Sequence, residues 1–210
     1  MGIVQSYTSV SRFFRLWVYA MEFHTRRAQI SEATPAGGHV LIISPPTDPA
    51  IRLIAQSNET RETTLVCFSD SLEQRAIVRS KKWGGSRLHT RVVPFFQLPF
   101  PDSTIRTVFA NCFFDFCSTE ELQPVFSELS RVLEPGGILH SVYMAPAKSR
   151  LNRVWTWAFK VFPHLSCGCR AVSIGPHLSN AAFLVLQDRA MNRLGFPVQY
   201  TVAQRLEGVA

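Results

Sequence analysis

Short apolar runs alternate with segments of helical periodicity along most of the chain. The runs are rich in β-branched and aromatic residues and have proline, glycine or polar residues at their ends, as buried strands do. They occupy residues 39–44, 63–68, 91–96, 107–112 and 138–144. Helices are predicted at residues 49–57, 72–79, 120–133 and from residue 178. Strands that alternate with helices predict an α/β domain with a doubly wound, mostly parallel sheet.

The two ends of the chain depart from this alternation. Residues 1–34 carry apolar side chains near helical spacing and predict one or two helices, which end at the breaker Pro35–Gly38. We therefore divide the chain into an N-terminal helical cap, 1–34, and an α/β domain, 35–210, with an aromatic insert at 147–177. Residues 195–203 predict one strand of a closing hairpin.

Two turns in the second half of the chain carry a family resemblance. Leu98–Ser103 reads L-P-F-P-D-S, and Arg131–Gly137 reads R-V-L-E-P-G-G, with a predicted helix between them. The segments Gly168–Arg170 and Leu194–Val198 add to the pattern. The chain resembles the type 11 class I methyltransferases, in the branch that uses S-adenosylmethionine (SAM) on small molecules, quinones and lipids. The resemblance implies a Rossmann-like methyltransferase fold with a seven-stranded type of sheet, whose N-terminal helices cover the pocket.

The loop after the first strand departs from the family pattern, which reads V-L-E-x-G-x-G-x-G. Ile42 stands at the glutamate position, and Ser44, Pro46 and Asp48 stand at the glycine positions. Glycines in such a turn let the backbone approach the cofactor, whereas proline fixes φ and has no N–H to donate. The sequence therefore predicts that the cofactor cradle is altered.

Two further positions of the resemblance differ as well. Ser69 stands where the family has the acidic residue that binds ribose, and Pro94 stands at the aspartate that meets adenine. We therefore predict that the protein uses no cofactor. The alternative is that SAM still binds, through Ser44, Asp48 and Asp70.

Ligands of open α/β sheets bind in the crevice at the carboxyl ends of the strands. Three residues expected there are candidate catalytic groups, namely Asp115, Tyr143 and His24. A carboxyl group in apolar surroundings can stay protonated and donate a hydrogen bond. The candidate substrate-binding residues are mostly aromatic: Trp17, Phe23, Asn111, Phe113, Phe114, Met144, Trp155, Trp157 and Phe159. Such a lining suits a hydrophobic, polyketide- or terpenoid-like molecule.

Composition and cysteine spacing limit which class of protein the chain can belong to and which ligands it can bind. The chain is 46% hydrophobic and 18% charged, which suits a packed domain rather than a disordered one. Cys167–Cys169 is too tightly spaced for a zinc site, so no metal is expected. No signal peptide is recognised, and the cysteines do not form an even set, so we expect an intracellular, cytoplasmic protein.

The chain has a net charge of +7, but its basic residues form no recognisable nucleic-acid-binding motif, so we expect no nucleic-acid partner. Met1–Ser6 fits the N-myristoylation pattern, and Phe13–Tyr19 is aromatic and basic. These segments predict peripheral membrane contact through the N-terminal helix. The sequence does not predict an oligomeric state.

Three functions follow from these observations. The first is an enzyme of natural-product biosynthesis that no longer methylates and that assists a cyclisation, cycloaddition or isomerisation of a hydrophobic small molecule. Such reactions gain mainly from orientation and one well-placed hydrogen-bond donor. The second is a SAM-dependent O-, N- or C-methyltransferase with an atypical cofactor loop. The third is a non-catalytic, membrane-associated binding protein.

Overall fold

The computed structural model describes residues 38–57, 62–81, 88–94, 97–147, 149–161, 169–191 and 196–207, and everything below refers to these ranges. The predicted N-terminal cap and its residues Trp17, Phe23 and His24 lie outside the described residues. Within these ranges no helix has the length and apolar character needed to cross a bilayer.

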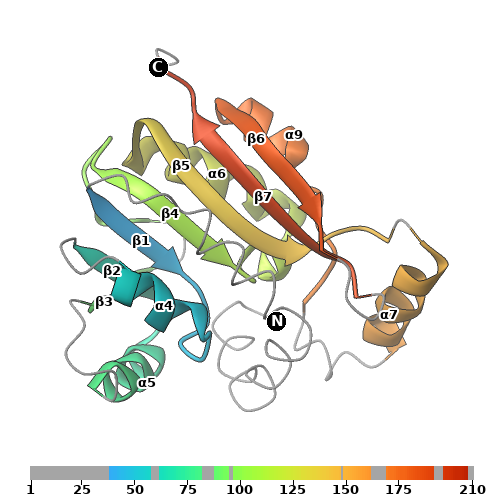
Figure 1. Ribbon diagram of the computed structural model, residues 1–210, viewed down its shortest axis with the longest axis horizontal. Helices are drawn as coiled ribbons and strands as arrows, with labels where there is room; N and C mark the ends of the chain where they lie inside the picture. Colours follow the sequence, from blue (N-terminus) through green and yellow to red (C-terminus); the bar gives the residue numbers. More distant parts are fainter. Residues whose placement is uncertain are drawn as a thin grey trace.

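A seven-stranded sheet forms the centre of the molecule, in the order β3-β2-β1-β4-β5-β7-β6 (Figure 1). The strands are β1 His39–Ile43, β2 Thr63–Cys67, β3 Leu88–Val92, β4 Ile105–Asn111, β5 Leu133–Met144, β6 Phe183–Ala190 and β7 Val198–Arg205. β7 runs antiparallel to both of its neighbours, and all other neighbouring pairs are parallel. The predicted doubly wound, mostly parallel α/β fold is therefore confirmed.

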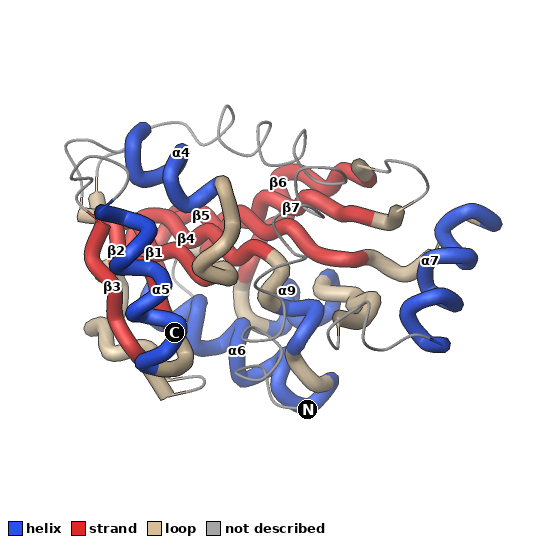
Figure 2. Tube along the Cα trace, turned by 90° about the horizontal axis from the view of Figure 1, so that it is seen from below, coloured by secondary structure: helices blue, strands red, loops and turns tan. Residues whose placement is uncertain are grey.

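Helices cover both faces of this sheet. They are α4 Ala50–Ser57, α5 Asp70–Lys81, the short 3-10 helix η2 Phe114–Phe116, α6 Thr119–Val132, α7 Arg150–Val161 and α9 Gly175–Asn180. α4 lies on one face and α6 and α9 on the other, whereas α7 lies beyond the end of the sheet (Figure 2). The central strands are covered on both sides, which explains why β2 is buried along its whole length and β1 at every position except His39.

Arg131 joins the two turns that carry the family resemblance. Its guanidinium donates to the Glu128 carboxylate at 2.8 Å and to the carbonyl oxygens of Leu98 and Phe100 at 3.0 Å. α6 begins with a capping box, in which Ser118 and Glu121 each accept a hydrogen bond from the backbone N–H of the other. The β4–α6–β5 unit is therefore fixed at both ends.

Three predicted boundaries are wrong. The fifth strand begins at Leu133 rather than at residue 138. The third strand covers Leu88–Val92 rather than residues 91–96, because Pro94 has no N–H to donate to the sheet. The helix expected from residue 178 ends at Asn180, and β6 follows it. Residues 183–186 are apolar and fit either element, and their pairing with β7 selects the strand.

Candidate functional site

The loop between β1 and α4 contains a buried polar cluster at the carboxyl ends of β1 and β4. The Asp48 carboxylate accepts hydrogen bonds from Ser44 Oγ at 2.6 Å, the Ala50 backbone N–H at 2.9 Å and Asn111 Nδ2 at 3.3 Å. Asp48 thus caps α4 and binds two polar side chains that are themselves buried. Nearby, the buried hydroxyl of Thr47 has no hydrogen-bond partner among the described residues.

The neighbouring crevice, between the ends of β2 and β4, is filled by aromatic rings. Phe68 and Phe113 stack with a centroid separation of 5.7 Å and an interplanar angle of 12°. The cavity left beside them measures about 10 Å³, which is room for one water molecule at most. Ser69 caps α5 by accepting the Leu72 N–H at 3.4 Å, and Asp70, the first residue of α5, is exposed.

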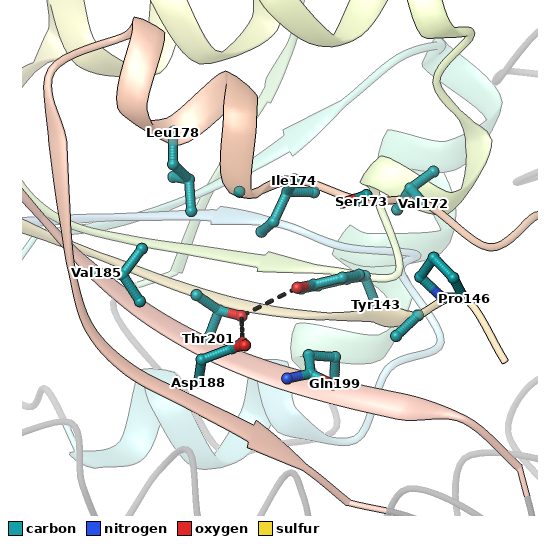
Figure 3. Close-up of a pocket in the computed structure, with 12 residues that line it drawn as sticks. Tyr143, Pro146, Val172, Ser173, Ile174, Leu178, Val185, Asp188, Gln199 and Thr201 are labelled. Carbon is teal, nitrogen blue, oxygen red and sulfur yellow. Dashed lines mark hydrogen bonds between the residues drawn. The ribbon is translucent and has the colours of Figure 1, made fainter. Parts of the chain in front are cut away.

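A larger cavity lies between β5, β6, β7 and α9 (Figure 3), and we call it the α9 cleft. Its volume is about 240 Å³, and its lining is mostly apolar. It is lined by Tyr143, Ala145, Pro146, Val172, Ser173, Ile174, Gly175, Leu178, Val185, Asp188, Gln199 and Thr201. It lies at the carboxyl end of β5, beside the antiparallel strand β7, and not at the point between β1 and β4 where the strand order reverses.

A chain of hydrogen bonds runs along one wall of the α9 cleft. The Thr201 hydroxyl donates to the Asp188 carboxylate at 2.7 Å, and Tyr143 Oη lies 3.2 Å from Thr201 Oγ1 (Figure 3). Because the single hydroxyl proton of Thr201 is directed at Asp188, Tyr143 must donate to Thr201. Burial raises the pKa of Tyr143, and the charge of Asp188 adds to this, so the phenol stays protonated at neutral pH.

The predicted catalytic carboxyl, Asp115, lies in the core rather than on the α9 cleft. It is 2% exposed, and its carboxylate accepts the Met144 backbone N–H at 2.8 Å. Its carbonyl oxygen accepts the backbone N–H of Arg170. These bonds join the end of β4 to the end of β5 and to the chain before α9, a positioning role that the sequence did not indicate.

The predicted substrate-binding residues do not gather in one place. Phe113, Phe114 and Met144 are buried, and Phe114 stacks on Phe126 with centroids 4.6 Å apart. Three of the aromatic candidates, Trp155, Trp157 and Phe159, belong to α7. Of the candidate catalytic and substrate-binding residues within the described ranges, Tyr143 alone lines the α9 cleft.

Three polar residues of the α9 cleft escaped the sequence analysis, namely Asp188, Gln199 and Thr201. Gln199 and Thr201 are 4% and 2% exposed and alternate along β7, so both side chains reach the same face. Two polar residues at alternate positions, between Val198, Tyr200 and Val202, were the available signal. Among the described residues no three His, Cys, Asp or Glu side chains group as a metal site would require.

Comparisons with known proteins identify the fold. Residues 50–141 match the family model of a methyltransferase domain. No curated protein sequence matches the chain. A SAM-dependent methyltransferase from Methanosarcina mazei has a TM-score of 0.68 at 17% identity, over 84% of this chain and 96% of that chain.

Two further solved structures show how varied the chemistry on this fold is. The (4+2)-cyclase SpnF has a TM-score of 0.68 at 18% identity, over 88% of this chain and 81% of that chain. The geranyl diphosphate C-methyltransferase of Streptomyces coelicolor, solved with S-adenosylhomocysteine, has a TM-score of 0.68 at 14% identity, over 88% of this chain and 78% of that chain. At these identities the likeness shows the fold, and the fold alone does not select a reaction.

The prediction that the protein uses no cofactor is corrected by these findings. Residues 50–141 match the model of a methyltransferase domain, and structures of similar fold hold SAM or S-adenosylhomocysteine. An altered loop is therefore no ground for excluding an adenosyl cofactor. The loop after β1 still offers buried polar groups, namely those of Ser44, Asp48 and Thr47. Phe68 and Phe113 stack at the ends of β2 and β4.

Proposed function

Since the chain is a methyltransferase-like protein with the class I fold, we propose that it is an enzyme that acts on an apolar small molecule bound in the α9 cleft. The observation that carries this proposal is the hydrogen-bond chain from Tyr143 through Thr201 to Asp188. A buried tyrosine hydroxyl that faces a cavity and leads to a carboxylate is an arrangement suited to proton transfer.

The direction of these hydrogen bonds defines which polar group a ligand must present to Tyr143. Tyr143 donates its proton to Thr201, so its oxygen is an acceptor toward the cleft. A ligand hydroxyl that donates to this oxygen can transfer its proton to Tyr143 while Tyr143 transfers its own proton to Thr201. Thr201 in turn transfers its proton to the exposed carboxylate of Asp188. Because the pKa of Tyr143 is raised, its phenol transmits the proton rather than storing a negative charge.

Size and lining limit the ligand. A volume of about 240 Å³ lies just below the range of roughly 300–1,000 Å³ that is usual for small-molecule sites. The walls are mostly aliphatic, from residues such as Ile174, Leu178 and Val185. A phenol or enol on a compact apolar frame meets these limits, and its acidity suits transfer toward a carboxylate better than that of an alkyl alcohol.

Two reaction classes use such a proton transfer. Cyclisation or isomerisation of an enol or phenol needs the hydroxyl group to be held and deprotonated as the new bond forms. Methyl transfer to a hydroxyl group also releases a proton, and the match of residues 50–141 to a methyltransferase domain favours this second candidate. We propose the same ligand site for both.

Naphthol is a suitable probe, because its fluorescence responds to its surroundings and it carries one acidic hydroxyl group on an apolar frame. We expect saturable binding to the protein and weaker binding to Tyr143→Phe. Tyr200→Phe is the matched control, because Tyr200 is buried in the adjacent strand and bonds His140 instead of lining the cleft. Naphthalene, which lacks the hydroxyl group, should bind both variants equally. Equal naphthol affinity of Tyr143→Phe and the unmodified protein would refute the proposal.

A further inference from the structure

Helix α7 presents an apolar face to solvent. Leu151, Val154, Trp157 and Val161 recur at helical spacing, and their exposed fractions are 57%, 56%, 61% and 47%. Figures 1 and 2 both show α7 at one end of the molecule, away from the layers that cover the sheet. Apolar side chains that gather in this way on an exposed helix mark an interaction surface.

The opposite side of α7 holds the helix on the domain. Asn152 is 2% exposed and caps the helix start through hydrogen bonds with Ser149. Trp155 packs edge-on against Phe196, with ring centroids 5.7 Å apart. The exposed face is therefore a second apolar surface of the helix, distinct from the one that the domain already covers.

The charges of α7 indicate which partner suits this face. The segment Arg150–Val161 contains basic residues and no aspartate or glutamate, and the whole chain has a net charge of +7. An exposed tryptophan among aliphatic residues, flanked by arginines such as Arg153, is the composition of helices that lie in the headgroup region of an anionic bilayer. Exposed Val78 on α5 provides a contrast, because α5 carries acidic residues in its first turn.

We propose that α7 docks on anionic lipid membranes, with Leu151, Val154, Trp157 and Val161 in the headgroup–acyl boundary and Arg153 at the lipid phosphates. This contact differs from the one predicted for the N-terminal segment, and it does not depend on the ligand of the α9 cleft. Ala145 and Pro146, which line that cleft, lie in the chain between β5 and α7, so a membrane-bound α7 would bring the cleft close to a source of apolar molecules.

The test is co-sedimentation of the full chain with vesicles of phosphatidylcholine and phosphatidylserine in equal parts, and with vesicles of phosphatidylcholine alone. We expect binding to the mixed vesicles that weakens with added salt. Val154→Glu should reduce the partition coefficient at least tenfold. Val78→Glu is the matched control, because the two valines are 56% and 55% exposed on helix surfaces. It should bind as the unmodified protein does.

Three outcomes would overturn the proposal. The first is the absence of binding to the mixed vesicles by folded protein. The second is equal binding by Val154→Glu and Val78→Glu, which would place the contact elsewhere, for example in the N-terminal segment. The third is a dimer in solution that Val154→Glu dissociates, because the apolar face would then belong to a second copy of the chain. Circular dichroism of both variants confirms that each is folded.

Discussion

Phe68 and Phe113 stack at the ends of β2 and β4, and removing one ring tests whether this pair limits the binding of an adenosyl cofactor. Replacing Phe68 with alanine opens the crevice where the nucleoside of related complexes is expected. We expect the Phe68→Ala variant to bind S-adenosylhomocysteine more tightly than the unmodified protein. The physical reason is that the unmodified protein must separate the rings before the ligand can enter.

The magnitude follows from the surroundings of Phe68. Its stacking on Phe113 at 5.7 Å contributes about 1 kcal/mol. Its side chain is 8% exposed, and moving the ring into water costs roughly 2 kcal/mol more. A closed state favoured by about 3 kcal/mol weakens apparent affinity by roughly 100-fold. Since the alanine variant also loses ring contacts with the ligand, we expect its affinity for S-adenosylhomocysteine to be at least tenfold higher than that of the unmodified protein.

Isothermal titration calorimetry with S-adenosylhomocysteine measures this gain directly. The control is Phe183→Ala, which removes a ring that is 4% exposed in β6, at the opposite edge of the sheet from β3. Both truncations should destabilise the domain by about 3–5 kcal/mol, so stability alone cannot separate them. If folded Phe68→Ala binds no more tightly than the unmodified protein or Phe183→Ala, the rings are not what limits cofactor binding.

Two further predictions concern buried titratable groups. Burial lowers the pKa of His140 from 6.5 to about 4, so the unfolded chain binds more protons in this interval and stability should fall as the pH falls from 6.5 to 4, by up to about 3 kcal/mol. Urea unfolding across this range should show the loss, and His140→Gln should show a smaller one; equal slopes would contradict the assignment. Asp115→Ala removes the acceptor of the Met144 N–H and should cost about 1–3 kcal/mol, read as a lower thermal midpoint, whereas Asp115→Asn keeps an acceptor and should cost less. Full stability of Asp115→Ala would show that the bond is not structural and would return Asp115 to the candidate catalytic groups.

The sequence was sufficient to predict a helix or strand where the local residue pattern agrees with the pairing of the strands in the sheet. The capping signal at Ser118 marks the start of α6, which begins at Thr119, and the helix ends at Val132, one residue before its predicted end. β6 was missed because its apolar residues satisfy a helical and an extended pattern equally, and only long-range pairing with β7 decides between them. Periodicity carries no such long-range information.

The candidate site was harder to predict than the fold. Tyr143 was selected because it lies near the end of a central strand, but its partners Thr201 and Asp188 come from strands far along the chain. Asp115 was chosen for its apolar neighbours, which could not reveal that a backbone N–H occupies its carboxylate. Hydrogen-bond partners of this kind are set by tertiary packing, so a single sequence does not display them.

The cluster around Asp48 also restricts how this loop can evolve. Replacing Asp48 with glycine would remove the cap of α4 and take from Ser44 and Asn111 the acceptor that they share. Each buried donor that loses its acceptor costs about 1–3 kcal/mol, so this single replacement would destabilise the domain. Because the three side chains are coupled, their replacements are not additive. The loop is therefore expected to change through simultaneous or compensated replacements, and the order in which they occur decides which descendants remain folded.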